Sequence, residues 1–181
     1  MGFLYKALFY TFAALVSITP NFILRQITSA IARLAYAVNK KHRKIAQVNL
    51  DFAFDGGIST ERKKEITIHA YENLLRNLVG IVKNLHISRS GLLAKCEYEG
   101  VEIVERLVKE GKKIIFVTAH YGNWEALGKA VSVKTGVRMV AVGRELDATA
   151  LNDVLKKSRE RFDAELISKH GAMRKLVKAL K

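Results

Sequence analysis

The second half of the sequence alternates short runs of β-branched or aromatic residues with stretches of helical periodicity. A continuous apolar run such as Ile114–Thr118 is typical of a strand that is buried on both faces. The predicted strands are Cys96–Glu99, Ile114–Thr118, Arg138–Val142 and Glu165–Ser168; the predicted helices are Val101–Glu110, Asn123–Lys134, one capped by Asp147 that extends to Phe162, and Ala172–Leu180. This alternation predicts an α/β fold, a mainly parallel sheet with helices on its faces, with ligands outside the carboxyl ends of its strands.

The first 85 residues are predicted to be mostly helical instead. Phe22–Val38 carries an apolar stripe of Ile23, Ile27, Ala30, Leu34 and Val38, which indicates an amphipathic helix. Asp51–Ser59 contains two adjacent glycines and is predicted to be a loop. Glu61–Leu85 keeps a helical period, and Ser59 or Thr60 is expected to cap it.

The net charge of +14 is concentrated near the start of the chain: residues 1–50 hold seven Lys or Arg and no acidic residue. Clustered cations indicate an anionic partner, either nucleic acid or a membrane surface. With 49% hydrophobic and 27% charged residues, the chain is neither a disordered tail nor a polytopic membrane protein. The single cysteine, Cys96, excludes a disulfide framework within the chain and is expected to be a packed residue.

The residues beside these cations favour the membrane surface over nucleic acid. Ala7–Thr19 is uncharged, shorter than the ~20 residues of a perpendicular spanning helix, and is closed by Pro20. The amphipathic segment follows, and then the basic cluster Lys40–Lys44. Apolar anchor, amphipathic helix and polybasic patch in series are typical of a protein held on a membrane. A buried core helix and a secretory signal remain alternatives for the first segment.

His120 and Glu125 are the candidate catalytic pair. His120 follows the predicted strand Ile114–Thr118, and Glu125 lies at the start of the next predicted helix, which Asn123 is expected to cap. A carboxylate so placed can orient an imidazole and stabilise its protonated form, which suits a general base. A structural histidine hydrogen-bonded to a nearby glutamate remains the alternative. No metal ligand set is expected, because the other histidines lie in separate elements.

The segment FVTAHYGNWEALG (residues 116–128) resembles the His-x-x-x-x-Glu block of the bacterial lipid A biosynthesis (lauroyl/myristoyl) acyltransferase family, within the lysophospholipid acyltransferase-like superfamily. RKIAQVNLDFAF (43–54) is similar to the family's basic-Asn-Leu-x-x-Ala-Phe stretch, and YEGVEIVERLVKEGKKIIFVTAH (98–120) to its lead-in to the catalytic strand. Residues 142–181 resemble the segment that carries the family's arginines and its Gly-Ala-Met-Arg helix. The resemblance extends over nearly the whole chain.

The resemblance implies an enzyme on the cytoplasmic face of the bacterial inner membrane. It would move a fatty acyl chain from acyl carrier protein to a hydroxyl of a lipid A precursor, without a cofactor. His120 and Glu125 match the catalytic pair, while Arg144 and Arg159 match arginines that would position phosphate or the acyl-phosphopantetheine. Asn123 is expected at the substrate. The backbone N–H groups near Gly122 and Asn123, or an arginine, could stabilise the oxyanion. Trp124 is either a packed core residue or part of the acyl channel wall.

Family members continue beyond the point that corresponds to Lys181, so the chain is expected to be C-terminally truncated. Residues 1–45 are predicted to form the membrane-associating segment, and residues 46–181 the N-terminal part of an α/β acyltransferase domain. A different lysolipid or glycolipid acceptor and an inactive membrane-binding fragment are the alternatives. A nucleic-acid-binding module, favoured only by the sequence pI of about 10.0, is not expected.

Overall fold

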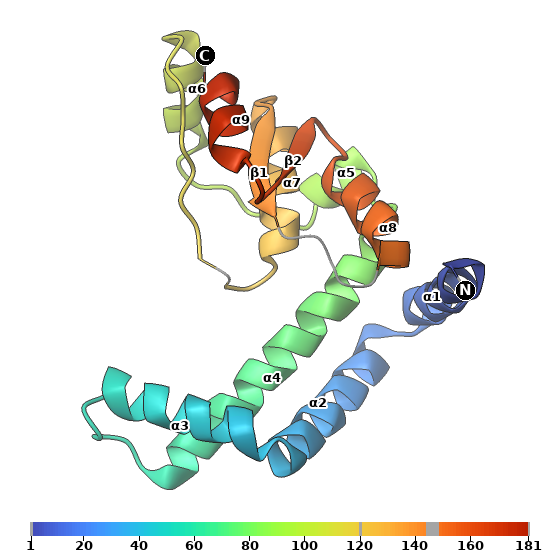
Figure 1. Ribbon diagram of the computed structural model, residues 1–181, viewed down its shortest axis with the longest axis vertical. Helices are drawn as coiled ribbons and strands as arrows, with labels where there is room; N and C mark the ends of the chain where they lie inside the picture. Colours follow the sequence, from blue (N-terminus) through green and yellow to red (C-terminus); the bar gives the residue numbers. More distant parts are fainter. Residues whose placement is uncertain (1, 120, 144–148, 181) are drawn as a thin grey trace. The chain divides into compact units, whose positions relative to one another are not determined.

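The computed structural model describes residues 2–119, 121–143 and 149–180 (Figure 1). The described residues are mostly helical and include a small parallel sheet. The elements are α1 (Gly2–Ile18), α2 (Asn21–Val38), α3 (Lys40–Ala53), α4 (Thr60–Lys83), α5 (Arg89–Leu93), α6 (Val101–Lys109), α7 (Trp124–Thr135), β1 (Met139–Gly143), α8 (Thr149–Arg159), β2 (Ala164–Ser168) and α9 (Ala172–Ala179).

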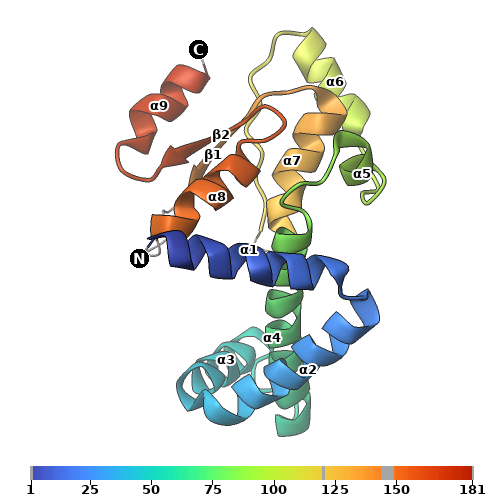
Figure 2. The same ribbon diagram turned by 90° about the vertical axis from the view of Figure 1, so that its right-hand side faces the viewer.

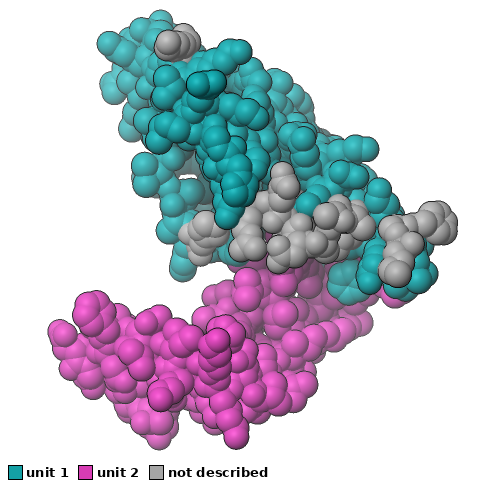
Figure 3. Space-filling view, in the orientation of Figure 1, with its two compact units in different colours: residues 1–12, 83–181 teal, residues 13–82 magenta. Residues whose placement is uncertain are grey.

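The chain divides into two compact units (Figure 3). One contains residues 13–82, and the other contains residues 1–12 together with residues 83–181. The predicted boundary between residues 45 and 46 lies inside α3, and it stays a prediction.

The unit of residues 13–82 confirms the prediction of a helical first half. Ser59 caps α4 as expected, because its Oγ accepts a hydrogen bond from the backbone N–H of Arg62 at 3.1 Å. The predicted loop was placed too early, since residues 51–53 form the last turn of α3. The left-handed backbone that ends the helical segment begins only at Asp55, with a φ of +48°, and not at the start of the glycine-containing run.

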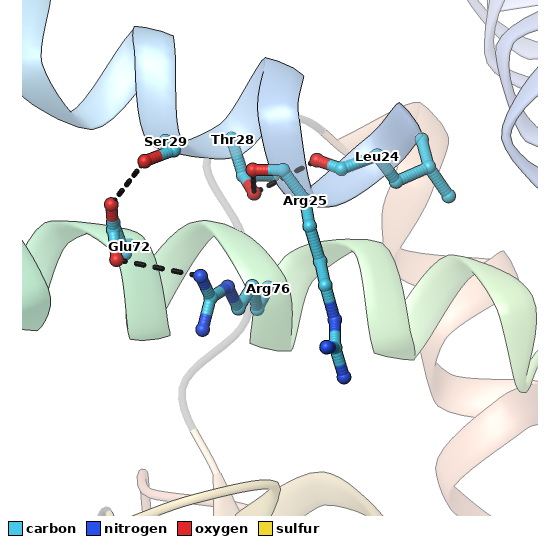
Figure 4. Close-up of polar contacts among 6 residues, drawn as sticks. All are labelled: Leu24, Arg25, Thr28, Ser29, Glu72 and Arg76. Atoms are coloured by element: carbon cyan, nitrogen blue, oxygen red, sulfur yellow. Dashed lines mark hydrogen bonds and ion pairs between the residues drawn. The ribbon is translucent and has the colours of Figure 1, made fainter. Parts of the chain in front are cut away.

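Helix α2 is buried on its small and polar side rather than on its aliphatic stripe. Leu24, Thr28 and Ala32 are buried, and Ser29 donates a hydrogen bond to Glu72 of α4, which also contacts Arg76 (Figure 4). The large aliphatic residues of the adjacent stripe are 38% to 68% exposed: Ile23, Ile27, Ile31, Leu34 and Val38. An aliphatic stripe that faces outward is typical of a helix that lies on a membrane.

Among the described residues, no single helix has both the length and the apolar character needed to cross a membrane. The segments Leu4–Ile18 and Asn21–Val38 meet that requirement only as a pair, and they are bent by 119° at the break between them.

The sheet lies in the other unit, and its two strands match two of the predicted ones. β1 and β2 run parallel, with Met139 opposite Ala164 and Gly143 opposite Ser168. Helices α7 and α9 both pack against the two strands, which lie between them in Figure 2. The helix between β1 and β2 makes this a strand–helix–strand crossover, so the predicted α/β character is confirmed in this part of the chain.

The other two predicted strands are wrong. Residues 112–119 belong to no strand, and the β-branched side chains of Ile115 and Val117 are 74% and 92% exposed. Cys96–Glu99 likewise lies outside any strand. The physical reason is that β-branched residues fit a strand without creating one, because a strand also needs a hydrogen-bonded neighbour. Among the described residues, β1 has such a neighbour in β2 only.

The end of α8 differs from the prediction, and its start cannot be compared, because Asp147 lies outside the described residues. The helix stops at Arg159 instead of continuing to Phe162. Phe162 and Asp163 both have a φ of +62°, a left-handed conformation that cannot extend a helix. The carbonyl of Asp163 then accepts from the N–H of Met139 at 3.1 Å, which joins this turn to the start of β1.

Candidate active site

Helix α7 begins as the sequence predicts, with Asn123 as its N-cap. The Oδ1 atom of Asn123 accepts a hydrogen bond from the backbone N–H of Ala126 at 3.1 Å. Gly122 precedes it with a φ of +57°, where a side chain would be strained. This cap places Glu125 in the first turn of α7. His120 lies outside the described residues, so its pairing with Glu125 stays a prediction.

Glu125 and Arg159 form a bidentate ion pair between α7 and α8. Nε of Arg159 donates to Oε2 of Glu125 at 2.9 Å, and Nη2 donates to Oε1 at 2.5 Å. Their side chains are only 27% (Arg159) and 14% (Glu125) exposed, so water screens the pair weakly. The hydrogen bond from Arg159 to the carboxylate raises the pKa of the guanidinium, although partial burial acts in the opposite direction. The structure therefore brings together two of the predicted site residues.

Lys129 lies one turn beyond Glu125 on the same side of α7. It is buried, at 8% exposure, and its Nζ donates a hydrogen bond to Oγ of the buried Ser158 at 2.9 Å. Burial lowers the pKa of Lys129, and the charges of Arg161 and Arg159 lower it further, whereas the Glu125 carboxylate raises it. The Glu125 carboxylate thus interacts with the cationic side chains of both Arg159 and Lys129.

The opposite side of α7 lines an open pocket of about 540 Å³. Its wall is mainly apolar and comes from α7, α5 and the segment after α5; the residues are Asn84, Leu92, Lys95, Cys96, Glu97, Tyr98, Asn123, Ala126, Leu127, Ala130 and Val131. Tyr98 donates to the carbonyl of Ala130 at 3.4 Å, and burial together with the neighbouring Cys96 raises the pKa of its hydroxyl. Asn123 therefore both caps the helix and borders the pocket.

The model of the family described as bacterial lipid A biosynthesis acyltransferase matches residues 3–181. The chain belongs to this family. No curated protein and no solved structure gives a significant match. Membership in the lipid A biosynthesis acyltransferase family makes acyl transfer to a lipid the chemistry to be explained.

The predicted residues of this lipid A acyltransferase family member fall into two groups. Asn123, Glu125 and Arg159 are described, and they lie at the start of α7 and the end of α8. His120 and Arg144 lie outside the described residues, so their roles stay predictions. Trp124 is half-buried, which leaves open whether it packs in the core or borders an acyl channel.

Sequence reasoning missed Lys129 and Ser158. The spacing of Glu125 and Lys129 along a helix was visible, since residues four apart share a helix side. The hydrogen bond to Ser158 of α8 could not be predicted, because the two residues are 29 positions apart and the sequence around Ser158 contains no signal for it. Within the described ranges, no group of three or more His, Cys, Asp or Glu side chains could hold a metal ion.

Proposed function

We propose that this protein transfers a fatty acyl chain from acyl carrier protein to a hydroxyl group of a lipid A precursor. The observation that carries the proposal is the family match over residues 3–181, which includes the His-x-x-x-x-Glu block. The cap at Asn123 supports it, because it fixes Glu125 at the start of a helix directly after that histidine.

In the proposed reaction, His120 removes the proton from the acceptor hydroxyl, and the hydroxyl oxygen attacks the carbonyl carbon of the acyl thioester. The backbone N–H groups of Gly122 and Asn123 stabilise the resulting oxyanion. The tetrahedral intermediate then expels the thiolate of the phosphopantetheine arm, which takes up the proton held by His120. Glu125 orients the imidazole and stabilises its positive charge.

The ion pair with Arg159 is compatible with this role of Glu125. Each carboxylate oxygen has two lone-pair positions, so a bidentate guanidinium leaves one position on each oxygen for an imidazole N–H. Arg159 also keeps N–H groups that Glu125 does not occupy. These N–H groups and Arg144 are the proposed contacts for a phosphate of the substrate.

The pocket beside α7 is the proposed site for the acyl chain. Its wall is mainly apolar, with Leu92, Leu127 and Val131 among the lining residues, and it borders the cap residue Asn123. A chain in this pocket would end with its thioester beside Asn123, next to the proposed oxyanion donors at the start of α7. Apolar contact of this kind suits a fatty acyl group.

The proposed location is the cytoplasmic face of the bacterial inner membrane. The outward aliphatic stripe of α2 and the basic cluster at 40–44 support binding to an anionic membrane surface. Replacing both Ile27 and Ile31 with serine should weaken binding to anionic lipid vesicles without lowering the stability of the protein, because both side chains are already exposed. Unchanged vesicle binding would contradict this location.

The acceptor is tested by product analysis. The protein is incubated with acyl carrier protein charged with a lauroyl chain, in the presence of either a lipid A precursor or a lysophospholipid, and the lipids are examined by mass spectrometry. The proposal predicts one added acyl group on the lipid A precursor. Acylation of the lysophospholipid alone would assign the protein another acceptor, and release of no thiol with either lipid would contradict acyl transfer by this chain.

A further inference from the structure

We infer that Lys129 and Ser158 are positioning residues for acyl transfer, which hold Arg159 on the carboxylate of Glu125. This inference rests on the proposed function, since it assigns a role to residues that lie near Glu125 and Arg159 in the chain and have no proposed contact with the substrate.

Two parallel contacts join α7 to the last turn of α8. Glu125 binds Arg159 through two hydrogen bonds, and one turn further along α7 Lys129 binds Ser158, the residue before Arg159. A single contact would allow α8 to slide or turn on α7. Two contacts from consecutive turns fix the register of the helices, so the guanidinium has one position relative to the carboxylate.

The Lys129–Ser158 contact is the more deeply buried of the two. Lys129 is 8% exposed and Ser158 is 4% exposed, whereas the Arg159 side chain is 27% exposed. A buried ammonium group loses hydration, and one hydrogen bond donated to a hydroxyl oxygen replaces only part of it. A methionine of similar length would fill the same space without that cost. Stability alone therefore does not account for a lysine at this position.

Charge also links Lys129 to the same site. The Glu125 carboxylate favours the charged form of Lys129, so the two groups attract one another, and Arg159 and Arg161 add further positive charge around the lysine.

The test measures kcat and KM for transfer from lauroyl-charged acyl carrier protein to a lipid A precursor, using the full protein in membranes. We expect Lys129→Met to lower kcat by ~10-fold to ~100-fold, because small displacements of a catalytic group have effects of this size. KM should stay unchanged, and the thermal midpoint of unfolding should not fall. Lys129→Arg should recover activity relative to Lys129→Met, and Lys157→Met, on the exposed side of α8, is the matched control.

A second background separates positioning from packing. If Lys129 acts through Arg159, Lys129→Met should have little further effect on kcat in an Arg159→Lys protein. A full additional loss there, or a normal kcat for Lys129→Met in the wild-type background, would overturn the inference. If Lys129→Met does not fold, Ser158→Ala removes only a hydroxyl and must show the same fall in kcat. Normal activity of Glu125→Gln would instead overturn the proposed function.

Discussion

The ion pair between Glu125 and Arg159 makes a measurable contribution to stability. Each charge-assisted hydrogen bond contributes about 1.5–3 kcal/mol. Loss of one partner from a fully buried pair costs about 3–5 kcal/mol. This pair is partly exposed, at 14% for the Glu125 side chain and 27% for that of Arg159, so the cost must be discounted. We expect Arg159→Gln and Glu125→Gln each to lower the free energy of unfolding by about 2 kcal/mol.

The assay is chemical denaturation followed by tryptophan fluorescence. Trp124 is the single tryptophan of the chain and precedes Glu125 directly, so its emission reports on the start of α7. In a double-mutant cycle, the double variant should cost little more than either single variant, which gives a coupling energy of about 1–2 kcal/mol. Strictly additive losses, with a coupling below about 0.3 kcal/mol, would refute the reasoning.

Three further predictions use the same fluorescence measurement. Burial lowers the folded-state pKa of Lys129, so the protonated lysine opposes folding. As the pH increases from this lowered pKa to the usual value of about 10.4, the free energy of unfolding should therefore rise. The Lys129→Met variant should lack this rise. Asp163→Gly should not destabilise the protein and should gain up to about 1 kcal/mol, because Asp163 has a φ of +62°; a loss would contradict this. Gly136→Ala should cost about 1 kcal/mol, since Gly136 ends α7 with a φ of +69°, and an unchanged stability would contradict that geometry.

Features set by neighbouring residues could be predicted from the sequence. The caps at Ser59 and Asn123 follow from side chains that bond to N–H groups three residues away. Asp163 has a φ of +62°, a left-handed conformation that aspartate adopts more readily than most residues. Strands β1 and β2 were predicted within one residue at either end, because each is a short, mainly apolar run.

Features set by distant partners could not be predicted. The run Ile114–Thr118 has the composition of a strand, but whether it forms one depends on a neighbour that its own residues do not specify. The contact between Glu125 and Arg159 spans 34 residues and depends on how α8 packs. From the sequence, Glu125 was predicted to orient His120, and Arg159 was predicted to position phosphate. The contact between the two side chains could not be predicted.

Helix α2 shows the same distinction. The periodic spacing of the aliphatic residues in α2 predicts an amphipathic helix. This spacing does not determine whether the aliphatic stripe packs in a core or is exposed. The buried set of Leu24, Thr28 and Ala32 answers that question, because these residues lie beside the stripe and not within it.

The central claim is that His120 and Glu125 carry out acyl transfer, and it is tested by transfer of a radiolabelled acyl chain from acyl carrier protein to a lipid A precursor. Wild-type protein is compared in membranes with His120→Ala and Glu125→Ala. The account predicts labelled lipid with the wild type and loss of at least ~10²-fold in rate with each variant, with normal protein levels and fold. Wild-type turnover in either variant would contradict it.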